Sequence, residues 1–552
     1  MCVVRRVAIL FALIASPALG AEPAWRALLP EGWLGVVAIA DPEATDAKIG
    51  RLLGDLSFDY AGGLAAFKAA VGDPTLQLNG RELVVGCAMR DGDAAAPYWF
   101  ALAPLDDFDA WLNAAGGETI GEVGVVSLGG IEVCLAPCGE WVFVTSLNRI
   151  DTARVASKQA IARVPRAAPG APTDEVVLEV SPTGIDYLAE RAAQVDGRAR
   201  RRVLHAGLTW PPTRRQLEAA VLQNAPLLEQ WRQSLTGLRL GAELPEAGGV
   251  TLRLSSAARE PIDPQPAPAS VPMLAAANTA VLVADAPSGG PLTDRLVGLY
   301  TAYDQGRPDQ VDAAAFPDGL YDPFSEARRR ACRGVAAWRM VFLDRSAGDR
   351  PLAACQASVM TTPDPQRTRD DIRQIISRWN DLVAGAGAKM PLVFAAETVT
   401  RGGREIDEYR VDMVTAVGVP DSVEIRAMMV RLYGEAGEYV RRVIPVGDDL
   451  LLETDAPLDE ALAMAEQIER AERQPVTNAW RASIRVDRFL AWQAALRDVA
   501  RGEVWGEKPE RPMNDAATLN LTAAAEPDRL QLEAHADRDA VRAIGRYLRA
   551  NR

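Results

Sequence analysis

Histidine, the side chain most often used for proton transfer near neutral pH, is scarce in this chain. His205 and His535 are the only two among 552 residues. Neither has a second histidine or a cysteine at helical or strand spacing, as a metal site or a triad built on histidine would favour. The sequence also lacks a Gly-x-Ser-x-Gly elbow, a phosphate-cradling glycine-rich loop and a His-Glu-x-x-His pattern. Triad or metal chemistry through histidine is therefore disfavoured.

Carboxylates are the other candidates for acid–base chemistry. They include adjacent aspartate pairs at positions 106–107, 370–371 and 448–449. Two acids can hydrolyse a glycoside when a cleft holds them at a defined separation. The first two pairs begin or occupy expected helices, where carboxylates stabilise the N-terminal end, and the third lies in a turn. Helix stabilisation is the simpler interpretation, and catalysis by a pair is the alternative.

Asp41 and Asp285 are the strongest single candidates among the acids. An internal match described below places both at the end of a strand just ahead of a helix, with Pro42 or Pro287 nearby. Aspartate before a helix accepts hydrogen bonds from its first free N–H groups, and proline is common in the first turn. We expect both residues to cap helices, with a catalytic role as the alternative.

Five cysteines follow the N-terminal segment, namely Cys87, Cys134, Cys138, Cys332 and Cys355. Cys134 and Cys138 flank an expected turn between two strands, which predicts a disulfide. Cys332 ends an expected helix and Cys355 lies in the second strand after it, so a second bridge is expected. Cys87 lies in an apolar strand and is expected to be buried. No histidine or further cysteine accompanies the first pair, so a metal site is the weaker alternative and no cofactor is expected.

The twelve tryptophans allow two interpretations. Exposed tryptophan is a stacking platform for sugars, which would suit a carbohydrate binder. Trp99, Trp141, Trp338 and Trp480, however, lie on strands rich in apolar residues. Packing in the core is the default for such positions.

The N-terminus has the pattern of a cleavable secretory signal. Arg5 and Arg6 precede an apolar run at 7–14, and Ala18 and Gly20 supply the small residues of a cleavage site. An uncleaved anchor would need about 20 continuous apolar residues, whereas Pro17 interrupts this run. We expect cleavage after Gly20 and a periplasmic or secreted protein with no integral membrane segment.

Composition narrows the class of partner. The formal net charge of −14 becomes more negative when the two signal arginines are removed, and an acidic chain repels phosphate backbones. Two arginine runs, at 198–202 and 328–330, lie on expected helices without interleaved aromatics. We interpret both as solvated helix faces and expect no nucleic-acid binding.

The chain matches itself in one order along two stretches. The matched segments are 37–41 with 281–285, 51–54 with 295–298, Trp111 with Trp379, 140–146 with 448–454, 187–189 with 489–491, and 238–242 with 519–523. A chain of this length is too long to fold around a single hydrophobic core, so at least two domains are expected. The matches therefore predict two related halves.

Four prolines within 260–268 predict an extended spacer between these halves. The expected organisation is a signal peptide at 1–20, a first half at 21–259, a linker at 260–271 and a second half at 272–552. Apolar and polar residues alternate along the expected strands. These strands come in neighbouring pairs joined by glycine-rich turns. We therefore expect α+β halves, each a mostly antiparallel sheet with helices packed on one face, and an inserted helix at 422–433 in the second.

With its signal segment, a strand ending in Asp41 or Asp285 before a helix, and closing strand–helix pairs, the chain resembles a loose class of uncharacterised exported bacterial proteins built from two such halves. The resemblance covers nearly the whole chain. It implies an envelope location and the fold, and it transfers no functional residues.

The sequence thus favours an exported envelope protein that binds or scaffolds an unknown ligand or protein without catalysis. An acid-dependent hydrolase with a carboxylate site between the halves is one alternative. A structural component of a surface assembly is another.

Overall fold

The structure, a computed structural model, describes most of the chain in segments. These are residues 24–60, 62, 82–90, 93–105, 107–128, 131–154, 174–193, 229, 232–233, 236–257, 270–274, 280–287, 326–327, 330–331, 334–345, 351–353, 355–385, 393–416, 422–434, 437–476, 479–500, 517–526 and 529–550. With 38% helix, 42% strand and antiparallel sheet, the expected α+β class is confirmed.

The chain forms two compact units. Unit 1 contains Met1–Gln194, Trp231–Glu260 and Arg529–Arg552, and unit 2 contains Val195–Gln230 and Pro261–Asp528. The last segment of the chain therefore belongs to unit 1, although it was expected in the second half. The linker at 260–271 lies mostly outside the described residues.

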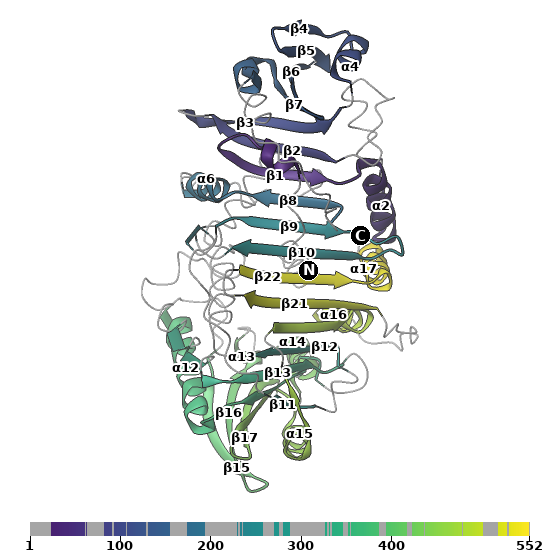
Figure 1. Cartoon of the computed structure of the whole chain (residues 1–552). Helices are drawn as coiled ribbons and strands as arrows, with labels where there is room; N and C mark the ends of the chain where they lie inside the picture. Colours follow the sequence, from purple (N-terminus) through teal and green to yellow (C-terminus); the bar gives the residue numbers. More distant parts are fainter. Residues whose placement is uncertain are drawn as a thin grey trace. The chain divides into compact units, whose positions relative to one another are not determined.

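Unit 1 is a long antiparallel sheet. Its strands are β1 (Trp33–Ile39), β2 (Leu83–Arg90), β3 (Asp93–Pro104), β4 (Glu118–Ile120), β5 (Val123–Leu128), β6 (Ile131–Cys138), β7 (Trp141–Ser146), β8 (Val176–Val180), β9 (Leu238–Glu243), β10 (Val250–Ala257) and β22 (Arg529–Ala536). Its helices are η1 (Ala24–Leu28), α2 (Pro42–Asp55), α4 (Phe108–Ala114), η2 (Leu147–Arg149), α6 (Pro182–Ala193) and α17 (Arg538–Ala550). Nine strands follow the order β4-β5-β6-β7-β3-β2-β1-β8-β9. Beside β9 lies β10, which pairs with β22 (Figure 1).

Unit 2 is also built on an antiparallel sheet. Its strands are β11 (Ser270–Pro272), β12 (Leu282–Pro287), β13 (Ala337–Phe342), β14 (Gln356–Thr361), β15 (Ala395–Arg401), β16 (Arg404–Asp412), β17 (Glu438–Val446), β18 (Leu450–Thr454), β19 (Arg473–Pro475), β20 (Ala479–Arg485) and β21 (Thr518–Glu526). Its helices are α12 (Pro365–Gly385), α13 (Met413–Ala416), α14 (Val423–Tyr433), α15 (Leu458–Arg470) and α16 (Val486–Ala500). The sheet order is β15-β16-β17-β18-β14-β13-β12-β20-β21, and β11 pairs separately with β19.

The two strand orders correspond one for one. Numbered along the chain within each series, and with the small β11–β19 pair left aside, both sheets follow the order 4-5-6-7-3-2-1-8-9. The tenth strands of the two series, β10 and β22, pair with each other in an antiparallel ladder from Val250↔Ala536 to Ala257↔Arg529.

Helices pack on both faces of each sheet, so the expectation of helices on one face is wrong. In β18, Leu450 and Leu452 pack against α15, whereas Leu451, between them, packs against Ile372 of α12. Successive residues of a strand point to opposite faces, so a strand that is apolar at consecutive positions needs cover on both sides.

Unit 1 is organised in the same way. Phe100 and Phe143 belong to a core beneath Trp25 of η1. On the other face, α4 packs through Leu112 against β5, β6 and β7. The C-terminal helix α17 lies beside α2 (Figure 1), where Arg538 and Arg542 each bond Asp55 at 3.0 Å.

Candidate functional site

Asp41 caps α2, as the sequence predicts. Its carboxylate accepts hydrogen bonds from the N–H groups of Glu43 and Ala44 at 3.1 and 3.0 Å, and Pro42 follows at the first helical position. Two of the free N–H groups at this helix end are thereby satisfied. A carboxylate occupied in this way has a structural role.

Asp285 does not end a strand before a helix, and this prediction is wrong. It lies inside β12, opposite Arg339 on one side and Arg481 on the other. Its carboxylate bonds the buried guanidinium of Arg339 at 2.6 and 3.1 Å. The error comes from the match of 37–41 with 281–285, which places equivalent residues 244 positions apart. It aligns Ala38, which lies in the core of unit 1, with Leu282, whereas the residue of β12 that packs against the core under α15 is Val283. A shift of one residue exchanges the faces of a strand.

The predicted Cys134–Cys138 disulfide is wrong. Both residues are free thiols on β6, which continues to Cys138, and the turn lies at Gly139, where φ is +72°. Four residues along a strand span about 13 Å, about twice the Cα separation that a disulfide allows. Both thiols are buried, and burial raises the pKa of Cys134 to about 11, which makes it unreactive.

The remaining cysteines also differ from expectation. Cys355 is a buried free thiol whose pKa burial raises to about 12, and Cys332 lies outside the described residues. Cys87 was expected to be buried but is exposed on β2. An exposed thiol on an apolar strand indicates that one face of this sheet is uncovered at that point.

Trp99 shows the same uncovered face. Trp338 and Trp480 pack edge to face with ring centroids 5.2 Å apart, and Trp141 packs against the core of unit 1. Trp99 instead is 40% exposed and lies directly opposite Cys87. The prediction of core packing is therefore confirmed for Trp141 and wrong for Trp99, whereas Trp338 and Trp480 are partly buried against each other.

Exposed apolar side chains continue across the neighbouring strands. Val37 of β1 lies opposite Val85 of β2, and they are 36% and 42% exposed. Ala101 of β3 lies opposite Val85, and Leu178 of β8 lies opposite Val37. Directly opposite residues of an antiparallel pair share a face. We call the surface formed by Val37, Val85, Cys87, Trp99, Ala101 and Leu178 the outer face.

The outer face carries no ionisable group apart from the Cys87 thiol. It lies back to back with the core, because Val36, Val84 and Phe100 alternate with its residues along the same strands. The sequence does contain a pattern that indicates the outer face. Strands apolar at consecutive positions, such as 34–39 and 83–85, are apolar on both faces.

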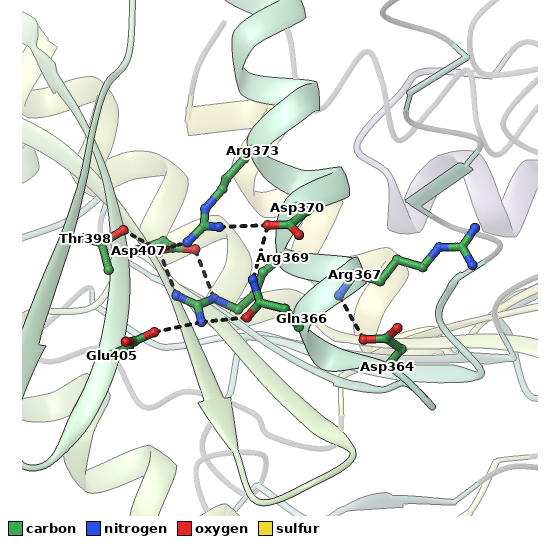
Figure 2. Close-up of polar contacts among 9 residues, drawn as sticks. All are labelled: Asp364, Gln366, Arg367, Arg369, Asp370, Arg373, Thr398, Glu405 and Asp407. Atoms are coloured by element: carbon green, nitrogen blue, oxygen red, sulfur yellow. Dashed lines mark hydrogen bonds and ion pairs between the residues drawn. The ribbon is translucent and has the colours of Figure 1, made fainter.

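A buried charge cluster joins α12 to β16 in unit 2. Figure 2 shows Arg369 and Arg373, one turn apart on α12, both directed at Asp407. Arg369 donates to both carboxylate oxygens at 3.1 and 2.9 Å, Arg373 donates at 2.8 Å, and Thr398 donates at 2.9 Å. Glu405 lies 3.4 Å from Arg369.

This cluster holds the helix on the sheet. Burial alone would raise the pKa of Asp407, but the hydrogen bonds from Arg369, Arg373 and Thr398 outweigh it and lower the pKa. Asp407 is thus ionised and already accepts four hydrogen bonds, so it is a poor base. No local sequence pattern marks this cluster, because its two arginines lie 38 and 34 residues from Asp407.

Among the described carboxyl groups, Asp455 has the pKa that is raised furthest above its ordinary value. It is buried, and its Oδ1 accepts a hydrogen bond from the backbone N–H of Gln356 at 2.6 Å. Burial raises its pKa to about 7, and this one hydrogen bond and the nearby guanidinium of Arg441 offset only part of the effect. A second carboxylate facing it across a cleft would be needed for glycoside hydrolysis.

The predicted acid pairs do not converge in the described structure. Asp107 caps α4 by accepting from Ala110 N–H at 2.9 Å, and Asp106 lies outside the described residues. Asp370 bonds Arg373 at 2.7 Å and Asp449 bonds Arg473 at 2.6 Å. Among the described residues no group of acids, cysteines and histidines could hold a metal ion.

A small hollow beside α2 in unit 1 is rich in charge. Lys48, Arg51 and Arg538 line it together with Gly248 and Gly249. Each cation bonds a carboxylate: Lys48 bonds Glu175, Arg51 bonds Glu246 and Arg538 bonds Asp55. These ion pairs link α2 to Glu175, to Glu246 and to α17, so the hollow lacks the free positive charge that an anion would need.

Comparison with known proteins finds no matching family model, no similar curated protein and no similar solved structure. Within the ranges that the structure covers, no helix combines the length and apolar character of a membrane span.

Proposed function

We propose that this chain is a non-enzymatic, exported protein of the cell envelope that holds a protein partner on the outer face of β1, β2, β3 and β8. The observation that carries the proposal is the exposure of Val37, Val85 and Trp99 on one continuous sheet face. Contiguous exposed apolar side chains mark interaction surfaces in water-soluble proteins.

The chemistry of the outer face favours a protein partner with an apolar surface. A sugar would need hydrogen-bonding groups beside Trp99, but its cross-strand neighbour is Cys87 and the adjoining pair is Val85 and Ala101. The neighbouring strands add Val37 and Leu178, neither of which can pair with a charged ligand. A side chain from an apolar protein surface leaves no polar group unpaired there.

Photo-crosslinking tests this proposal in the native envelope. Val85 is replaced by p-benzoyl-phenylalanine, and Glu132, exposed on β6 outside the outer face, receives the same replacement as a control. We expect a defined crosslinked protein from position 85 and none from position 132. The partner is then purified, and its affinity for wild type and for Val37→Lys is measured.

Cys87 supplies a second readout without any substitution. It should react with a maleimide in the isolated chain and be protected when the partner is bound. The proposal fails if position 85 crosslinks only within its own chain, or if Val37→Lys binds the identified partner as tightly as wild type.

Export is part of the same proposal and rests on the N-terminal signal pattern. N-terminal sequencing of the protein from the envelope fraction should begin at Ala21. Material that begins at Met1 would show that the signal is not removed.

We further propose that the two strand series arose by duplication. Support comes from the shared order 4-5-6-7-3-2-1-8-9 and from the equivalent placing of α4 and α12 after the third strand of each series. An experimental structure tests this proposal, because superposing 22–258 on 272–552 should match these strands in order and direction.

A further inference from the structure

The strand β15 is a long, uncovered edge. It ends the sheet order of unit 2 and pairs only with β16 among the described strands. It has seven residues, and all but Val399 are exposed. The edge strand of unit 1, β4, has only three residues.

An edge strand presents unpaired N–H and C=O groups to any other strand. Proteins usually limit this exposure with short edge strands, proline or lysine. By its length β4 fits that pattern, whereas β15 (Ala-Ala-Glu-Thr-Val-Thr-Arg) contains neither proline nor lysine. Its backbone is therefore available for pairing.

Two opposite charges lie on β15 in a self-complementary arrangement. Glu397 and Arg401 share one face of the strand with Val399 between them, because alternate residues point to the same side. Neither charged side chain has an ion-pair partner in the part of the chain that the structure covers. Thr398 and Thr400 lie on the other face.

We propose that β15 pairs with β15 of a second copy of this chain, antiparallel, about a two-fold axis through Val399. This register places Glu397 opposite Arg401 of the second copy, and the symmetry makes the same pair again. Thr398 lies opposite Thr400 of the second copy, and Val399 lies opposite itself. Charge pairs and threonine pairs directly opposite each other stabilise antiparallel strands.

Neighbouring registers lack this complementarity. A two-fold axis through Thr398 places Glu397 opposite Val399, and one through Thr400 places it beyond the end of the strand. In both cases the two charges remain unpaired. The same argument selects a second copy over an unrelated extended peptide, because such a peptide would have no reason to repeat the spacing of Glu397 and Arg401.

A charge-exchange series tests the proposal by sedimentation equilibrium on the full chain. Wild type should dimerise. Glu397→Arg and Arg401→Glu each place like charges opposite one another twice, so each should weaken dimerisation roughly tenfold or more. The double variant E397R/R401E restores both pairs with the signs exchanged and should regain affinity close to that of wild type. Glu132→Arg, on β6, is the matched control and should change nothing.

Crosslinking tests the register of the proposed pairing between the two β15 strands. In a Cys87→Ser background, Val399→Cys should form a covalent dimer with a short bis-maleimide, whereas Ala395→Cys should not, since it lies outside the paired segment. A monomeric wild type at all concentrations overturns the proposal. So does a double variant that dimerises no better than the single variants, or equal crosslinking at positions 395 and 399. Near-UV circular dichroism of each variant verifies that the fold is retained.

Discussion

Asp407 and Asp455 are both buried carboxyl groups, yet their pKa values shift in opposite directions. Asp407 accepts hydrogen bonds from Arg369, Arg373 and Thr398, which favour the charged form. Asp455 has a backbone N–H as its hydrogen-bond donor, so burial dominates and raises its pKa to about 7. The donors that surround a buried acid decide which protonation state the fold requires.

Asp407→Asn should destabilise unit 2 by about 3 kcal/mol at neutral pH, because it leaves Arg369 buried without its counter-charge. The lowered pKa means that Asp407 contributes stability above its unfolded pKa, and this contribution is lost as pH falls through the folded value. The variant should therefore lose part of the acid dependence of the unfolding free energy, measured by urea denaturation. Asp370→Asn removes an exposed pair with Arg373 and should cost less than about 1 kcal/mol. Equal effects of the two substitutions would contradict the role given to the cluster.

Asp455→Asn should have the opposite pH dependence. Because the folded pKa is raised, native Asp455 keeps its proton between about pH 4 and pH 7 while the unfolded chain releases it. Wild type therefore loses stability as pH rises through this window. Asparagine stays neutral and can still accept from Gln356 N–H. We expect the variant to be more stable than wild type at pH 8, by on the order of 2 kcal/mol, and nearly equal at pH 4, where the unfolded chain also keeps much of the proton. An effect of the same size at both pH values would show that Asp455 does not titrate there.

Among the secondary-structure elements, α6 depends on a close approach to β1. Ser181 precedes the helix, accepts from Gly184 N–H at 2.9 Å and donates to the carbonyl of Trp33 at 2.5 Å. A Cβ atom on Gly184 would lie 1.9 Å from the carbonyl oxygen of Leu34. Only glycine allows the helix to lie this close to the strand.

Gly184→Ala should therefore destabilise unit 1 by about 3 kcal/mol, because the helix must move away from the sheet. Gly54, in α2, has no atom within 4 Å of its added Cβ, so Gly54→Ala should be neutral or slightly stabilising. Chemical denaturation of both variants makes the comparison. A Gly184→Ala protein as stable as wild type would mean that α6 does not lie against β1 as described.

At the scale of the whole molecule, the C-terminal segment completes unit 1. Strand β22 pairs with β10, and α17 bonds Asp55 through Arg538 and Arg542. The end of the chain thus stabilises elements formed near its beginning.

Removal of residues 529–552 should expose β10 and leave Asp55 without its two arginines. Hydrogen exchange should become faster at 250–257, whereas β13 and β14 of unit 2 should keep their protection. Removal of 551–552 alone should change neither region. Unchanged exchange at 250–257 in the longer truncation would contradict the β10–β22 pairing.

Local signals in the sequence predicted local structure well. The helix expected at 422–433 is α14, with Ser422 as its cap and Gly434 at its end. The turn expected between Cys134 and Cys138 lies instead at Gly139 and Glu140, because the strand continues through Pro137. Longer-range features left no such signal. The pairing of β10 with β22 and the bonding of Arg369 to Asp407 join segments that are distant in sequence. The error at Asp285 arose because the two stretches were aligned by residue identity and not by which face of the strand is buried.

The β10–β22 ladder also sets an order of events during synthesis. Thr251 and His535, hydrogen-bonded across it, are 284 residues apart. At a translation rate of 5–20 residues per second, β10 emerges roughly 15 to 60 seconds before its partner. For that interval the edge of β10 that pairs with β22 has no partner strand. Folding of unit 1 can therefore finish only after residues 529–536 have emerged, which predicts late acquisition of protease resistance and a need for holding chaperones until then.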